Sequence, residues 1–154
     1  MNDDSRYIEE LSHKALLSVD PDIPPVPVEK IAEKLGITIV PFDFPDSFSG
    51  VFKQERRIIG VNKNHPLVRR RFTIAHELGH FVLGHEDDTI DERLDKPAPL
   101  EREANTFASF LLMPKKMIEK AVAEKGIDLK ALSLQFLVSE QALTIRLLQA
   151  GLIK

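Results

Sequence analysis

The feature that most constrains the fold is the stretch 66–83, which begins at Pro66 and is followed by Gly84. Its apolar residues recur at steps of three and four, the period of one face of an α-helix. The members of this stripe are Val68, Phe72, Ala75, Leu78, Gly79 and Val82. Proline is favoured at a helix start and glycine just past its end. The sequence therefore predicts a long helix that must be buried along one side.

The same stretch carries the pattern H-E-x-x-H, from His76 to His80. Residues four apart share a helix face, so both imidazoles can reach one metal ion. Glu77 is displaced by one position and is predicted to be a general base that takes a proton from metal-activated water. The alternative is an ordinary helix with two histidines. Their place beside the apolar stripe favours the metal site.

A catalytic zinc site normally has three protein ligands and one open position. The chain has no cysteine, so the third ligand must be His, Asp or Glu. His85 is one candidate, but it follows His80 closely, after a glycine. The long pattern H-E-x-x-H-x-x-G-x-x-H does not fit, because Leu83 and Glu86 stand where its glycine and last histidine belong.

A carboxylate from the next predicted helix, residues 100–113, is the better source of a third ligand. Glu101 and Glu103 are the candidates. Glu103 lies four residues before Phe107 and so projects toward the apolar stripe, which favours it over Glu101. The expected metal is Zn²⁺, although a His-His-Glu set also accepts Mn²⁺ or another divalent ion.

The rest of the chain alternates helical and strand patterns. Apolar periodicity predicts helices over 4–19, 27–35, 114–125, 129–137 and 139–150. β-branched runs predict strands over 37–42, 48–53 and 57–62, with Pro41 typical of an edge strand. Residues 85–99 are polar and acidic, and are interpreted as a surface loop. The predicted fold class is α+β, with a small, mostly antiparallel sheet.

One domain is expected over 1–154, with a catalytic core over 1–115 and a helical extension over 116–154. Residues 132–153 have the outline of a helix-turn-helix. Its second helix offers DNA little beyond Gln141, Arg146 and Gln149, and the net charge is −3. Direct DNA binding is therefore unlikely on the sequence alone. The apolar residues of that helix (Ala142, Ile145 and Leu148) are predicted to close the core or hold a partner.

Two weaker hypotheses concern substrate binding. The predicted strand 48–53 could offer an edge to which a peptide adds, with Phe48, Gly50, Val51 and Phe52 as contacts, or it is an ordinary sheet strand. Residues 53–71 are rich in Lys and Arg, whereas 86–103 are rich in Asp and Glu. These stretches are either solvated surface or steer a charged partner to the site.

Two blocks, FTIAHELGHFVLGH (72–85) and EREANTFASFLLMP (101–114), resemble the ImmA/IrrE family of metallopeptidases. The upstream PPVPVEKIAEKLGITI and SGVF…RIIGVN are similar to its N-terminal half. The resemblance implies a zincin-like active-site helix and gluzincin-type chemistry. It implies His76, His80 and Glu103 as zinc ligands and Glu77 as the base.

The same resemblance implies an endopeptidase that cleaves a partner helix-turn-helix repressor and so relieves repression. Such systems belong to phage or other mobile elements, toxin–antitoxin-like modules or stress responses in bacteria. The alternative function is a regulatory metal-binding protein that binds the repressor without cleaving it. No secretory signal and no membrane-spanning run is evident, so the expected location is the cytoplasm, with no membrane partner.

Overall fold

The computed structural model describes residues 3–19, 23–85, 89–92 and 99–154. The chain forms seven helices and four strands in this described part. In chain order these are α1 (Asp3–Leu17), α2 (Val28–Lys34), β1 (Thr38–Phe42), β2 (Phe48–Lys53), β3 (Ile58–Asn62), α3 (Leu67–Val82), β4 (Thr89–Glu92), α4 (Pro99–Leu112), α5 (Lys115–Lys125), α6 (Leu129–Phe136) and α7 (Glu140–Gln149). The predicted α+β class is confirmed.

The sheet has the strand order β1-β3-β2-β4. β1 runs parallel to β3, whereas β2 is antiparallel to both β3 and β4. β1 is an edge strand, as Pro41 predicts, because proline has no N–H to give to a second neighbour. The sheet is mostly antiparallel, also as predicted.

One prediction about this sheet is wrong, and one of the two alternatives for residues 48–53 is excluded. Residues 85–99 are not all loop, because Thr89–Glu92 form β4 and α4 already begins at Pro99. β2 is not an edge strand, because β4 pairs with it through Val51↔Ile90 and Phe52↔Thr89. Short strands are held by backbone pairing to a neighbour rather than by their own propensity, so four polar-flanked residues give little sequence signal.

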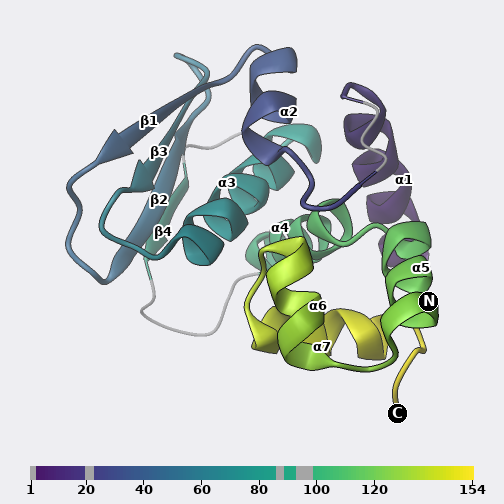
Figure 1. Cartoon of the computed structure of the whole chain (residues 1–154). Helices are drawn as coiled ribbons and strands as arrows, with labels where there is room; N and C mark the ends of the chain where they lie inside the picture. The colour runs from purple at the N-terminus through teal and green to yellow at the C-terminus, as the bar shows by residue number, and fades with distance from the viewer. Residues whose placement is uncertain (1–2, 20–22, 86–88, 93–98) are drawn as a thin grey trace.

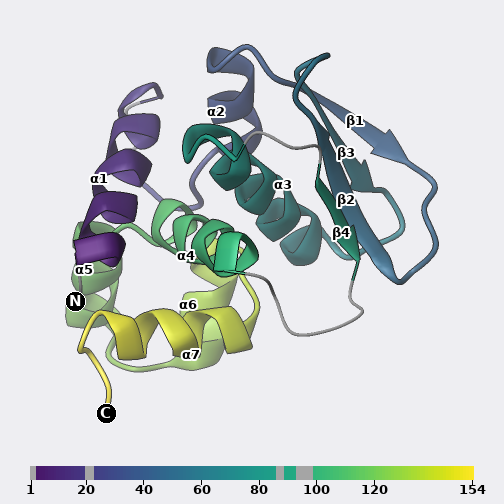
Figure 2. The same cartoon turned by 180° about the vertical axis from the view of Figure 1, so that it is seen from behind.

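Helix α3 lies between the sheet and α4, whereas α2 contacts both α3 and β1 (Figures 1 and 2). Its contact with β2 is close: a Cβ on Gly50 would come within 2.6 Å of both the Gly60 carbonyl oxygen and the Thr73 methyl group. Only a residue without a side chain lets this strand and this helix approach so closely. On its other side α3 packs against α4, which in turn contacts α1 and α7.

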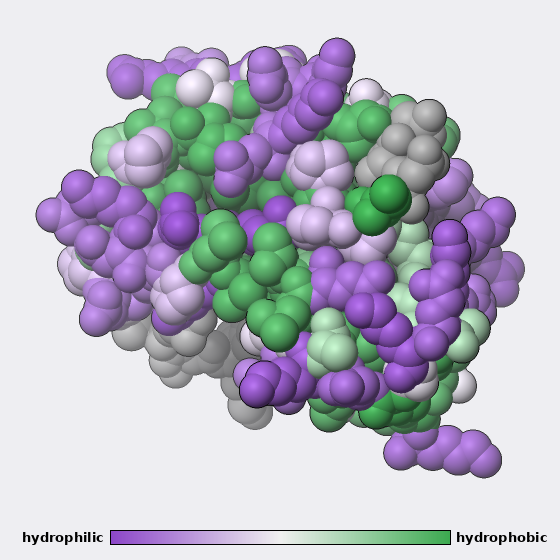
Figure 3. Space-filling view, in the orientation of Figure 1, coloured by the Kyte–Doolittle hydropathy of each residue, from purple (hydrophilic) through white to green (hydrophobic). Residues whose placement is uncertain are grey.

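The hydrophobic core is continuous from α1 and α2 through α3 to the C-terminal helices. α6 and α7 are capped at their N-termini by Asp128 and Ser139, whose side chains accept from Ala131 N and Ala142 N. Polar and charged residues cover most of the face seen in Figure 3, with apolar groups gathered near its centre. Within the described residues, no helix is both long and apolar enough to cross a membrane.

The inward face of α7 differs from the predicted one. Leu143, Arg146 and Leu147 are buried, whereas Ile145 and Leu148 are about half exposed. The cause is Arg146, which is 1% exposed: its Nε donates to the Met113 carbonyl at 2.8 Å, and its guanidinium lies 4.5 Å from the Phe110 ring centroid. Burial lowers its pKa. Arg146 is therefore a packing residue and is not available to DNA.

Candidate metal centre

Helix α3 presents His76 and His80 on one buried face. The two side chains are 3% and 0% exposed, and their Nε2 atoms lie 3.2 Å apart. One helical turn brings residues four apart over one another, so the convergence follows directly from the spacing in the sequence. The structure thus brings together the two predicted histidine ligands.

Glu101, in the first turn of α4, meets both histidines. Its Oε2 lies 2.9 Å from His76 Nε2, and its Oε1 lies 2.8 Å from His80 Nε2. Hydrogen bonds with these two rings hold the pKa of the Glu101 carboxyl far below its usual range, although partial burial opposes the shift. The carboxylate is therefore ionised at neutral pH, as a metal ligand must be.

These three side chains are the group of described residues whose donor atoms are close enough to share one cation. Donors bound tetrahedrally to one zinc ion at about 2.0–2.1 Å lie about 3.3 Å from one another. The two histidine Nε2 atoms are 3.2 Å apart, close to that value, and each carboxylate oxygen of Glu101 lies 2.8–2.9 Å from one of them. Two imidazoles and a carboxylate are also the donor set that zinc and related divalent ions accept.

Asn105 supports the fit. Its Oδ1 lies 2.7 Å from His76 Nδ1, one turn of α4 after Glu101. When Nδ1 donates to this amide oxygen, a neutral ring has a lone pair on Nε2, the atom that faces Glu101. A lone pair and a carboxylate 2.9 Å apart repel each other unless a cation or a proton lies between them. A metal ion satisfies both.

Glu103, the predicted third ligand, lies elsewhere. Its Oε1 is 2.9 Å from His85 Nε2, and it is not part of the three-residue group. Residues two apart on a helix point about 200° away from each other, so Glu101 and Glu103 cannot both face α3. The geometry favours Glu101. The apolar stripe does not settle the choice, because both glutamates lie at the start of α4, before its buried residues begin at Ala104.

His85, a candidate third ligand in the sequence, has a supporting position in the structure instead. Its Nδ1 lies 2.8 Å from His80 Nδ1, and its Nε2 lies against Glu103. A hydrogen-bonded chain therefore runs from His80 through His85 to Glu103. Such contacts fix the ring orientation of a ligating histidine. Asn105 does the same for His76, and neither contact was foreseen from spacing.

The α3–α4 approach that assembles the site depends on Gly79. A Cβ at this position would lie 3.1 Å from both the Ala104 carbonyl oxygen and the Phe107 ring. Small residues at a helix–helix contact allow the backbones to come close. Gly79 lies between the two histidines in the sequence, directly before His80, and its missing side chain lets α4 come close enough for Glu101 to reach them.

Glu77, the predicted base, is 0% exposed on the same helix, next to His76. Its catalytic role remains a prediction. Among the four predicted substrate contacts, Phe52 is a core residue, 0% exposed and 5.8 Å from the Phe81 ring, and Gly50 is buried against α3. Phe48 and Val51 are half-buried on β2, which β4 covers along its outer edge.

The basic stretch 53–71 is partly structural. Arg71 is 7% exposed, and its guanidinium donates to the Val26 and Leu137 carbonyls at 2.9 and 3.3 Å. Burial lowers the pKa of Arg71, and Glu29 opposes that shift. Arg57 lies over the Phe81 ring at 5.4 Å. Much of the acidic stretch 86–103 lies outside the described residues, so its predicted steering role stays a prediction.

Comparison with known proteins places the chain among metallopeptidases. The peptidase M78 profile, described as an IrrE N-terminal-like domain, matches residues 32–148. The radiation response metalloprotease IrrE of Deinococcus radiodurans is 33% identical over 92 residues, which are 54% of this chain and 27% of the relative. IrrE of Deinococcus deserti is 29% identical over 105 residues, 64% of this chain and 36% of the relative.

A solved structure has a similar fold. It is a Mycobacterium tuberculosis transcriptional regulator, with a TM-score of 0.63 and 20% identity, covering 96% of this chain and 47% of that one. At this identity the likeness concerns the fold alone. The chain spans about a quarter to a third of the length of the two IrrE relatives, and about half of the regulator.

Proposed function

Because the chain belongs to the ImmA/IrrE family of metallopeptidases, we propose that it is a metal-dependent endopeptidase whose centre is formed by His76, His80 and Glu101. The convergence of one donor atom from each residue, all within 4.8 Å of one another, carries the proposal. Zinc is the proposed ion, with manganese or another divalent ion as the alternative, because the donor set accepts several of them. Glu101 takes the ligand role that the sequence assigned to Glu103.

When bound, a divalent cation supplies Lewis acidity, which makes water a stronger acid and a peptide carbonyl a better electrophile. The chain's own part is to hold and move the proton. The Glu77 carboxylate accepts the proton of the attacking water and returns it to the leaving amine. Its position on α3, directly beside His76, favours this role. Asn105 and His85 keep the two imidazoles in position.

We further propose that the substrate is a helix-turn-helix repressor and that the protein works in the cytoplasm. The support is indirect. The two motif blocks resemble the ImmA/IrrE family, and the two sequence relatives carry the name radiation response metalloprotease. The fold relative is a transcriptional regulator, which is consistent with a role in gene control.

The test is to incubate the metal-loaded protein with a helix-turn-helix repressor encoded beside it and to measure intact masses. A new pair of fragments is expected, and it disappears with Glu77→Gln, with Glu101→Gln or after chelation. Glu124→Gln, on an exposed part of α5, is the matched control and cleaves like the wild type. Fragments that persist with Glu77→Gln overturn the catalytic assignment. Tight repressor binding without fragments supports the alternative, a regulatory protein that acts by binding.

A further inference from the structure

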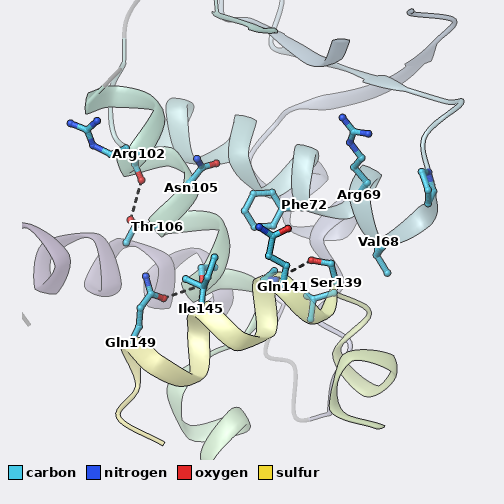
Figure 4. Close-up of a pocket in the computed structure, with 14 residues that line it drawn as sticks. Val68, Arg69, Phe72, Arg102, Asn105, Thr106, Ser139, Gln141, Ile145 and Gln149 are labelled. Carbon is cyan, nitrogen blue, oxygen red and sulfur yellow. Dashed lines mark hydrogen bonds between the residues drawn. The ribbon is translucent and has the colours of Figure 1, made fainter. Parts of the chain in front are cut away.

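A groove lies beside the metal centre, between α3, α4 and α7, with a volume of about 850 Å³ (Figure 4). Its centre is apolar: Phe72 comes from α3, and Val138, Ala142 and Ile145 come from α7 and the turn before it. The volume is in the upper part of the range for binding pockets and exceeds what one small side chain fills. Ile145 is 47% exposed, so its side chain is accessible to an occupant of the groove.

Among the described residues that line the groove, the two charged side chains are both arginines. Arg69 on α3 and Arg102 on α4 lie at its opposite ends in Figure 4, and Gln141 and Gln149 lie along α7 between them. None of the described residues that line the groove is Asp or Glu, although the chain as a whole has a net charge of −3. An occupant with acidic groups at its ends and apolar groups between them matches this pattern.

The groove adjoins the metal centre at Asn105. This residue lines the groove, and its Oδ1 lies 2.7 Å from His76 Nδ1. The three ligand side chains do not line the groove. An occupant would therefore lie next to the reacting centre without covering the atoms that hold the metal. This is the place of a site that binds a substrate segment some residues away from the scissile bond.

We propose that this groove binds a segment of the protein substrate in which apolar residues are flanked by acidic ones. The inference rests on the proposed peptidase function and names the chemistry that the same site selects. A polypeptide fits better than DNA, because DNA binding relies on neutralising several phosphates and the groove offers two arginines around an apolar centre. The binding energy is expected from burial of the substrate's apolar residues over Phe72 and Ile145.

The test uses the full chain, metal-loaded and carrying Glu77→Gln so that nothing is cleaved. The probe is a fluorescein-labelled peptide about 14 residues long, with Leu at helical spacing and Glu elsewhere. Its affinity is measured by fluorescence anisotropy. Ile145→Ser, and the double change Arg69→Glu with Arg102→Glu, are each expected to weaken binding about tenfold or more.

Two matched controls separate the groove from the surface in general. Leu148→Ser removes an aliphatic side chain that is 50% exposed on the same helix but does not line the groove. Arg56→Glu reverses an exposed charge in the turn between β2 and β3. Both are expected to bind the peptide within about twofold of the parent protein. Equal losses in the controls and the groove variants would overturn the proposal.

Further binding measurements use a different labelled ligand in place of the Glu peptide. A peptide with Lys in place of Glu, and a labelled duplex DNA, are both expected to bind at least about tenfold more weakly. Competition between DNA and the Glu peptide, with DNA the tighter ligand, would overturn the assignment to a polypeptide. The assignment would also be overturned if sedimentation showed that the peptide dimerises the protein and if the groove variants kept their full affinity for the peptide.

Cleavage and binding are separate readouts. Groove-dependent peptide binding by a protein that cleaves no repressor refutes the peptidase proposal and leaves the groove a peptide-binding site. Repressor cleavage that Ile145→Ser and the double arginine variant leave unchanged, together with unchanged peptide binding, refutes the groove assignment alone.

Discussion

At the scale of single residues, the site depends on which glutamate of α4 faces α3. The sequence predicts both histidines and the buried Glu77 correctly as neighbours on one helix, because the i, i+4 relation is a property of the helix itself. It does not predict Glu101 over Glu103, because that choice depends on how α4 is rotated against α3. Polar residues one turn apart occur twice at the start of α4, as Glu101 with Asn105 and as Arg102 with Thr106, so this pattern alone does not identify the face toward α3.

Glu101→Gln is expected to lower zinc affinity by about 100-fold or more, because it removes a charged donor in contact with both histidines. Glu103→Gln is expected to lower it by no more than about tenfold, because Glu103 reaches the centre only through His85. Chelator competition measures both. Equal losses, or a larger loss for Glu103→Gln, would restore the ligand set predicted from the sequence.

His85→Ala tests whether the hydrogen-bonded chain behind His80 positions that ring. The expected result is a loss of zinc affinity of about 10–100-fold, since removal of such a partner leaves the ligating ring free to turn. His13→Ala, exposed on α1, is the control and leaves the affinity unchanged. Thermal stability without metal distinguishes a positioning role from a general defect. A His85→Ala protein that unfolds earlier but binds zinc normally contradicts the positioning role.

At the scale of elements, the helix limits could be predicted to within one or two residues, because proline and glycine mark most of the ends. α3, expected over 66–83, spans Leu67–Val82. β4 and the inward face of α7 could not be predicted. β4 forms because it pairs with β2. The inward face of α7 is set by Arg146, a buried arginine that a hydropathy pattern assigns to the surface.

Gly79→Ala tests the spacing of α3 and α4. Alanine is the better helix former by about 1 kcal/mol, yet its Cβ would lie 3.1 Å from a backbone oxygen of α4 that cannot move alone. Overpacking of this kind costs about 1–3 kcal/mol, so a net loss of stability is expected, together with weaker zinc binding because the helices separate.

Gly126→Ala is the control for that change. Gly126 follows α5 with φ of 72° and has open space around its Cβ position, so alanine there strains the backbone without touching α4. It is expected to lower the free energy of unfolding and leave zinc affinity unchanged. If Gly79→Ala retains full zinc affinity, the spacing of the two helices does not control the site.

At the scale of the whole molecule, Arg146 joins three parts of the chain. From α7 it bonds the carbonyl of Met113, just after α4, and its Nη2 lies 3.9 Å from Glu9 on α1. The predicted helical extension over 116–154 is therefore packed into the same core as the predicted catalytic part. Cooperative unfolding of the two parts is the expectation, because they share buried contacts.

Arg146→Ala is expected to destabilise the whole chain by about 1–3 kcal/mol, because the Met113 carbonyl loses its buried donor. Chemical denaturation followed by both circular dichroism and intrinsic Tyr7 fluorescence should give one coincident transition in the variant and the wild type. Two separate transitions in the wild type would show that residues 116–154 fold as an independent unit.

A cation bound by the three metal-binding side chains would close a loop between α3 and α4, and so would restrict the unfolded chain. Glu101 follows His80 by about 20 positions, and the cost of closing a loop of that length grows only slowly with its size. The sequence contains no cysteine, so no disulfide can shorten its loops. A cation bound between α3 and α4 can act as a cross-link of this chain instead. Such a cross-link forms without oxidation, and a chelator removes it.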